Sequence, residues 1–128
     1  MKKNFWRNKT VLVTGHTGFK GSWLTLILNG LGAKVIGYAL NPISKPNFFD
    51  GARLTKFLKK DYRANILNLK KLKNVIKKEK PDLVFHLAAQ SSVLVSYKEP
   101  VETVTANVIG TINLLESIRS CKSVKSAI

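Results

Sequence analysis

Cysteine, acidic residues and long apolar runs are scarce in this 128-residue sequence. The single cysteine, Cys121, excludes an internal disulfide, and no matching His or Asn pattern marks it as a nucleophile. No run of eighteen apolar residues occurs, and the basic start at residues 1–9 lacks the apolar segment of a signal peptide. We therefore expect a cytoplasmic protein with no membrane span, and we assign no metal ligands.

The sequence has 7 Asp and Glu residues and 22 Lys and Arg residues, which gives a formal net charge of +15. Such a balance is typical of nucleic-acid-binding proteins. However, the lysines between Lys59 and Lys80 alternate with Leu69, Leu72 and Val75 at helical spacing, as on the solvated face of an amphipathic helix. No RNA-recognition, zinc-finger or helix-turn-helix signature accompanies them, so nucleic-acid binding is the least favoured function.

The sequence alternates between strand-like and helix-like segments, and its hydrophobic content of 45% is that of an ordinary globular domain. We predict a parallel sheet joined by right-handed helical crossovers. The fold class is therefore α/β, a doubly wound parallel sheet of the Rossmann type, incomplete after about five strands, in one domain over 1–128. The expected strands are 11–13, 34–38, 61–66, 83–87 and 124–128, and the expected helices are 19–30, 47–57, 69–78 and 101–119.

Three glycines follow the first expected strand at once: Gly15, Gly18 and Gly21. A strand, a glycine turn and a helix N-terminus form an anion site, because the first helical N–H groups are unpaired and the helix dipole is positive there. In such turns one glycine permits the reversal, another lets a pyrophosphate contact the backbone, and a third lets helix and strand approach. The alternative is that the glycines only permit a tight turn.

The expected helix after these glycines carries apolar residues at three- and four-residue spacing. That period predicts an apolar face packed back on the sheet. The residues of this expected inward face are Phe19, Trp23, Leu26, Ile27 and Leu31.

The fourth expected strand ends in residues that suit a ligand site. Ala88 and Ala89 would let a ribose and a nicotinamide lie against the backbone, and Gln90 could present an amide to a ligand; the alternative is that the small residues pack a crossover. We expect His86, alone in an apolar strand, to be a hydrogen-bonded core histidine rather than a catalytic one.

The segments TGHTGFKGSW, HLAAQ followed by SYxxP, and NVIGTINLLE resemble the amino-terminal part of CDP-glucose 4,6-dehydratases, within the extended short-chain dehydrogenase/reductase superfamily. The resemblance implies NAD as cofactor and conversion of CDP-glucose to the 4-keto-6-deoxy sugar with loss of water. Another nucleotide-sugar epimerase or dehydratase, or a non-catalytic nucleotide-binding module, stays open as an alternative.

The resemblance also implies roles for individual residues. The pyrophosphate loop would comprise Gly15, His16, Thr17, Gly18, Phe19, Lys20 and Gly21. The nicotinamide half would lie along Leu87, Ala88, Ala89 and Gln90, with Asn107 bracing that backbone, and the adenine would contact Asn65 and Ile66.

Two positions depart from the pattern of the superfamily. Asn65 stands where an aspartate usually binds adenine, so we expect weakened binding there. The usual acid for the adenosine ribose is replaced by Ala39, and Lys20 or Lys34 could even attract a 2′-phosphate. NAD is therefore favoured over NADP by the resemblance alone.

The catalytic residues of the superfamily are missing, because none of Tyr38, Tyr62 and Tyr97 is followed four residues later by lysine. We therefore assign no catalytic residue to this chain and expect CDP-glucose to bind only if the missing sugar-nucleotide domain is supplied. The full-length form is expected to be a homodimer. A truncated product, a fragment and one piece of a split protein all fit this pattern.

We expect the purified chain to show no turnover of CDP-glucose, because the tyrosine proton donor and its lysine are absent. The assay is the absorbance of the 4-keto product in alkali. Accumulation of that product above a protein-free blank would contradict the assignment.

Overall fold

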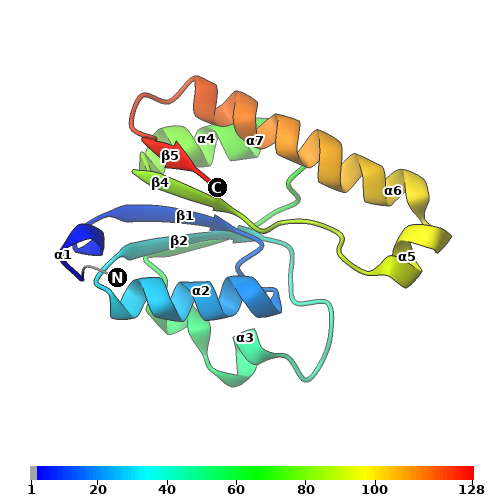
Figure 1. Cartoon of the computed structure of the whole chain (residues 1–128), viewed down its shortest axis with the longest axis horizontal. Helices are drawn as coiled ribbons and strands as arrows, with labels where there is room; N and C mark the ends of the chain where they lie inside the picture. The colour runs from blue at the N-terminus through cyan, green and yellow to red at the C-terminus, as the bar shows by residue number, and fades with distance from the viewer. Residues whose placement is uncertain (1–2) are drawn as a thin grey trace.

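The computed structural model describes residues 3–128, so the first two residues of the basic start lie outside it. Five parallel strands form one sheet in the order β3-β2-β1-β4-β5, with helices on both faces (Figure 1). This arrangement confirms the doubly wound parallel fold. The strands are β1 (Thr10–Thr14), β2 (Lys34–Ala39), β3 (Lys60–Arg63), β4 (Leu83–His86) and β5 (Ser126–Ala127).

The helices lie in two layers, with α2 against one face of the sheet and α4 and α7 against the other, and α3 packs beside α2 (Figure 1). A π-helical segment, η2 (Thr105–Ile109), joins α6 to α7, so the long helix expected at 101–119 is present. The short helix α5 was not predicted. The helices are α1 (Lys3–Trp6), α2 (Phe19–Gly30), α3 (Phe48–Gly51), the 3₁₀ turn η1 (Leu54–Phe57), α4 (Leu69–Glu79), α5 (Val93–Lys98), α6 (Pro100–Val104) and α7 (Gly110–Arg119).

The core is divided by the sheet, because successive strand residues point to opposite faces. In β1, Val11 and Val13 pack with Leu28 of α2, whereas Leu12 packs with Leu72 of α4 and Leu114 of α7. All of these side chains are at most 2% exposed. The sheet is therefore covered on both faces where its central strands run.

The lysine-rich helix α4 has the expected amphipathic form. Its buried side carries Leu72, Val75 and Ile76, while most of its lysines are exposed. The Asn68 side chain accepts a hydrogen bond from the Lys71 N–H at 3.0 Å, so Asn68 is the N-cap that the sequence suggested. The basic composition of this segment thus reflects a solvated helix face.

The predicted inward face of α2 is wrong. Phe19, Trp23 and Ile27 are 72%, 46% and 49% exposed, and the buried residues are Gly21, Ser22, Thr25 and Leu28. The reason is the close approach of helix and loop: a Cβ at Gly21 would lie 2.7 Å from the His16 Cα. Only small residues fit there, and their hydroxyls are satisfied by backbone carbonyls, as where Ser22 Oγ donates to His16 O at 3.0 Å.

Three strands are shorter than expected, and the fourth, expected over 83–87, ends at His86. The third was predicted at 61–66 and ends at Arg63, although the Ala64 N–H still donates to the Ala39 carbonyl at 2.9 Å. The fifth, expected over 124–128, has two residues. Among residues 3–128, no helix is long and apolar enough to span a membrane.

Replacing Gly37 with alanine should destabilise the fold by about 1–3 kcal/mol, the usual cost of overpacking. A Cβ at this position in β2 would lie 2.5 Å from the ring of His16, which is fully buried and has no room to move. Gly30→Ala is the control, because a Cβ there meets nothing within 4 Å. Urea unfolding measures both, and equal stability of the two variants would contradict this packing.

Candidate functional site

A cleft of about 990 Å³ opens at the carboxyl ends of the strands, where ligands bind in doubly wound sheets. The glycine loop after β1 forms its floor, and the loop between β2 and α3 forms one wall. The segments 64–67 and 87–91 and the start of the α6–η2 helix complete the lining. This volume suits an extended ligand.

The three glycines of the loop differ in what they do for the fold. Gly15 has φ +73°, and a Cβ there would lie 2.6 Å from the Leu87 carbonyl carbon. Gly21 can carry no side chain, because a Cβ there would lie 2.7 Å from the His16 Cα of the loop. Gly18, by contrast, has an ordinary φ of −73°, and a Cβ there would meet only the Gly15 oxygen at 3.4 Å. The fold therefore needs Gly15 and Gly21, whereas the bare surface of Gly18 faces the cleft.

The N-terminus of α2 supplies hydrogen-bond donors beside Gly18. No side chain within the described chain caps this helix at Gly18. The first N–H groups of a helix have no intrahelical acceptor, and the helix dipole makes this end positive. The arrangement suits an anion such as a pyrophosphate.

Most of the predicted cofactor residues line the cleft, and four do not. Those that line it are Gly15, Thr17, Gly18, Phe19, Asn65, Ile66, Leu87, Ala88, Ala89 and Gln90. His16, Lys20, Gly21 and Asn107 lie outside the lining. Gly21 acts through helix packing, and Lys20 is exposed on the first turn of α2.

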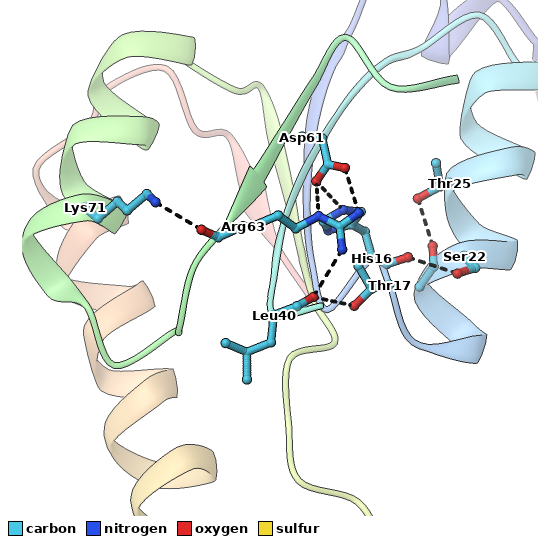
Figure 2. Close-up of polar contacts among 9 residues, drawn as sticks. His16, Thr17, Ser22, Thr25, Leu40, Asp61, Arg63 and Lys71 are labelled. Atoms are coloured by element: carbon cyan, nitrogen blue, oxygen red, sulfur yellow. Dashed lines mark hydrogen bonds and ion pairs between the residues drawn. The ribbon is translucent and has the colours of Figure 1, made fainter. Parts of the chain in front are cut away.

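The side chain of His16 turns away from the cleft into the protein interior (Figure 2). It is fully buried, its Nε2 lies 2.9 Å from Asp61 Oδ1, and its ring packs edge-on against Phe49 at 5.3 Å. Burial lowers the pKa of His16 below its ordinary value of 6.5, and the Asp61 carboxylate only partly offsets this. A neutral imidazole can donate from Nε2 to the Asp61 carboxylate, while the buried Nδ1 has no hydrogen-bond partner among the described residues.

Arg63 completes this group of side chains, which sequence reasoning missed. Its Nε and Nη2 each donate to Asp61 at 2.8 Å, and its guanidinium lies 4.8 Å from the centre of the Phe49 ring. Its Nη1 reaches the Leu40 carbonyl at 3.5 Å, and that carbonyl also accepts from Thr17 Oγ1 at 3.0 Å (Figure 2). The one available signal was the opposite charge of residues two apart on an expected strand, which places them on one face.

The backbone at Gln90 is held by Asn107. The Gln90 N–H donates to Asn107 Oδ1 at 2.8 Å, and Asn107 Nδ2 donates back to the Gln90 carbonyl at 3.0 Å. Asn107 thus makes the contact that the resemblance implied, from within η2. The Gln90 amide is itself occupied, because its Nε2 donates to Thr103 Oγ1 at 3.0 Å and its Oε1 accepts from the Ser92 N–H at 2.6 Å. Gln90 therefore shapes the segment rather than presenting a free amide.

His86 is a hydrogen-bonded core histidine, as predicted. Its Nδ1 lies 2.7 Å from Thr14 Oγ1 and its Nε2 lies 3.1 Å from Thr111 Oγ1. Thr111 donates its own proton to the Asn107 carbonyl at 2.6 Å, so it accepts from Nε2–H. Burial lowers the pKa of His86, so its imidazole is neutral at pH 7. Through its bonds to Thr14 and Thr111, His86 in β4 is linked to β1 and α7.

Asn65 and Ile66, the pair that the resemblance assigned to the adenine, line one part of the cleft. Asn65 Oδ1 accepts from the Leu67 N–H at 2.9 Å, and its carbonyl accepts from the Tyr38 hydroxyl at 3.1 Å. The suggestion that Lys34 attracts a 2′-phosphate is wrong, because Lys34 begins β2 and the cleft lies where β2 ends.

Tyr62 and Tyr97 lie outside the cleft lining, whereas Tyr38 is part of it and donates its hydroxyl to the Asn65 carbonyl. Burial and the neighbouring Glu79 carboxylate raise the pKa of Tyr62 to about 12, and its hydroxyl donates to Glu79 at 2.7 Å. Tyr97 is exposed on α5, and Tyr38 is buried. Over residues 3–128, no group of three or more His, Cys, Asp and Glu side chains is placed to hold a metal ion.

The free energy of unfolding should fall as the pH is lowered from 7 to 5. Both histidines have a folded pKa below 6.5, so the unfolded chain takes up protons in this range that the folded chain does not. His86→Gln removes one of the two groups and should reduce the slope. Urea unfolding at each pH measures the effect, and a flat profile would contradict it.

The chain matches the family model described as GDP-mannose 4,6 dehydratase over residues 12–128. It is 47% identical over 126 residues to a CDP-glucose 4,6-dehydratase of Salmonella typhimurium, which covers 98% of this chain and 35% of the relative. It is 37% identical over 119 residues to GDP-mannose 4,6 dehydratase 2 of Arabidopsis thaliana, over 88% of this chain and 32% of that protein. The chain thus spans about a third of the length of these relatives.

Solved structures agree with this relationship. A UDP-glucose 4-epimerase of Thermotoga maritima with UDP-glucose aligns with a TM-score of 0.79 and 31% identity, over 92% of this chain and 36% of that one. A UDP-glucose 4-epimerase of Brucella ovis in complex with NAD aligns with a TM-score of 0.76 and 28% identity, over 90% of this chain and 33% of that one. The sequence match over residues 12–128 and the shared fold lead to one conclusion: the chain belongs to the GDP-mannose 4,6 dehydratase family.

Proposed function

We propose that this chain is the NAD-binding portion of a CDP-glucose 4,6-dehydratase. The observation that carries the proposal is the bare surface of Gly18 at the N-terminus of α2, which faces the cleft although the fold itself leaves room for a side chain. Because the fold would tolerate a side chain at Gly18, the lack of one there is best accounted for by a ligand that contacts the backbone. The 47% identity to the Salmonella typhimurium enzyme supports the choice of substrate class.

The residues fit a dinucleotide laid across the ends of the central strands. The Gly18 backbone and the first turn of α2 would bind the pyrophosphate. The adenine would lie against Ile66, with the exposed amide of Asn65 in place of a carboxylate. The nicotinamide half would lie along Leu87 and Ala88, whose N–H groups both donate to Thr14 Oγ1 at 3.2 Å.

The rigidity of the nicotinamide side would serve catalysis by positioning. Thr14, His86 and Asn107 hold the backbone from Leu87 to Gln90 through hydrogen bonds. When bound, NAD supplies the acceptor for the hydride of the sugar C4 and its return at C6, so that CDP-glucose loses water without net oxidation. The sugar nucleotide would bind in the part of the relatives' length that this chain does not match.

A homodimer of the full-length form is supported by an apolar stripe on the outer side of the α6–η2–α7 helix. The stripe consists of Val104, Val108, Ile112 and Leu115, each at least half exposed. Their three- and four-residue spacing places them on one helix face. Contiguous exposed apolar surface of this kind marks a contact site.

Gly18→Val should abolish measurable NAD binding while leaving the fold intact. The branched side chain would occupy the pyrophosphate position, yet its Cβ would meet only one backbone atom of the loop, at 3.4 Å. Titration calorimetry with NAD measures the affinity, and thermal unfolding checks the fold.

Gly30→Val is the matched control, because Gly30 ends the same helix and a Cβ there meets nothing within 4 Å. This variant should bind NAD as the parent chain does. Unchanged NAD affinity in Gly18→Val would refute the proposed site.

A further inference from the structure

Every strand of the sheet begins at or just after an exposed cation. Because the five strands are parallel, they all begin at one edge of the sheet, which lies beside α1 and away from α5 and α6 (Figure 1). Six exposed cations therefore gather along this edge, and together they are named the basic edge. They are Arg7 before β1, Lys34 in β2, Lys60 in β3, Lys80 before β4, and Lys122 and Lys125 before β5.

The charge of the basic edge is not neutralised by the described chain. None of its six cations forms an ion pair within residues 3–128. Two acids lie near this edge, and other groups hold both. The Glu79 side chain is 6% exposed and lies 3.0 Å from Lys59 Nζ. Asp82 accepts from the Thr10 N–H at 2.8 Å and lies 3.8 Å from Lys9 Nζ.

Helix ends account for only part of this charge. Helices α2, α4 and α7 end at the basic edge, and a cation near each end is favourable because the helix dipole is negative there. Lys34, Lys80 and Lys122 serve this purpose. Arg7 and Lys60 lead into β1 and β3 and follow none of these three helices. Their exposed charge is therefore available to a partner.

Two exposed aromatic rings border the basic edge. Phe5, in α1, is 53% exposed and is held edge-on against Trp6 with ring centres 5.1 Å apart. Phe57, shortly before β3, is 39% exposed. Apolar rings beside lysines are typical of protein surfaces that lie on a membrane, where the rings enter the headgroup region and the cations meet anionic lipids.

The shape and composition of the basic edge favour a flat anionic partner over a nucleic acid. Four strand spacings of about 4.8 Å make the row of cations about 19 Å long. Five of the six cations are lysines, which act as compact point charges, whereas bidentate recognition of nucleic-acid phosphates favours arginine. The edge consists of turns and helix ends, so no helix or strand pair projects to enter a groove.

We propose that the basic edge is a docking surface for the anionic face of a lipid bilayer, with Phe5 inserted among the headgroups. Each cation held near such a surface adds about fivefold to the affinity. Binding of this kind is peripheral and needs no membrane-spanning helix. The cleft opens at the opposite edge of the sheet, so a docked molecule keeps it accessible from solution. The inference is therefore independent of the proposed dinucleotide site.

Vesicle flotation with the 128-residue chain tests the inference, because aggregated protein stays at the bottom of the gradient. Phosphatidylcholine vesicles with about one-third phosphatidylserine should carry the chain upward at about 0.1 M salt. Vesicles of phosphatidylcholine alone should not. Raising the salt to about 0.5 M should release the chain, because the charges are then screened. Binding that is indifferent to anionic lipid or to salt would overturn the inference.

Neutralising the basic edge should abolish most of this binding. The triple variant Lys34→Gln, Lys60→Gln and Lys125→Gln should weaken vesicle binding by about a hundredfold, at about fivefold for each charge. All three side chains are exposed and form no ion pair within the described chain, so the fold should be retained.

The matched control neutralises three exposed lysines near the other edge of the sheet, on the β2–α3 loop, the first turn of α4 and the end of α5. They are Lys45, Lys70 and Lys98. This variant has the same net charge as the first and should bind within about threefold of the parent chain, because salt screens distant charges. Equal losses in the two variants would show a net-charge effect and overturn the docking surface.

A second pair of variants tests the aromatic contact. Phe5→Ala should weaken vesicle binding by about tenfold, because the ring would be buried on docking. Tyr97→Ala, which removes a ring that is 83% exposed on α5, should have no effect. This pair decides the question if the triple variant does not fold in thermal melting. If the parent chain binds an RNA duplex and not the anionic vesicles, the partner is a nucleic acid and the inference is wrong.

Discussion

The structure depends on a contact between bare backbones at Gly15. This residue follows β1, its N–H donates to the Tyr38 carbonyl of β2 at 2.9 Å, and its α-carbon lies against the Leu87 backbone beyond β4. The first turn of α2 packs on the same loop through Gly21. Three strand ends and one helix end therefore meet without side chains between them. Because of this, the floor of the cleft is made of backbone, and N–H groups lie where a ligand can reach them.

The architecture was predictable wherever a local pattern has a single structural meaning. Buried strands of apolar residues, a glycine turn and the lysine-flanked stripe of α4 each predicted their element. The inward face of α2 was not predictable in this way, because the approach of helix to loop reverses the rule that large apolar residues face the core. Helix α5 was also not predicted, because Val93 and Leu94 are exposed and the segment has no buried apolar stripe with a helical period.

The site residues also fall into those that a local pattern predicts and those that depend on the folded sheet. Positions that act through backbone, such as Gly18 and Ala88, were found because glycine and alanine signal close approach. The histidine of the loop was assigned to the ligand, although its side chain belongs to the interior, because nothing in the local sequence shows which way it turns. Its partners Asp61 and Arg63 depend on the register of β3 against β2, and that register is a property of the folded sheet.

The aromatic side chains displaced to the outer side of α2 have an optical consequence. Trp23 is stacked on Phe48 with ring centres 4.7 Å apart, and Phe48 itself lines the cleft. The indole is 46% exposed and lies one ring away from any molecule seated between the two loops. A molecule that binds against Phe48 is therefore expected to change the fluorescence of Trp23.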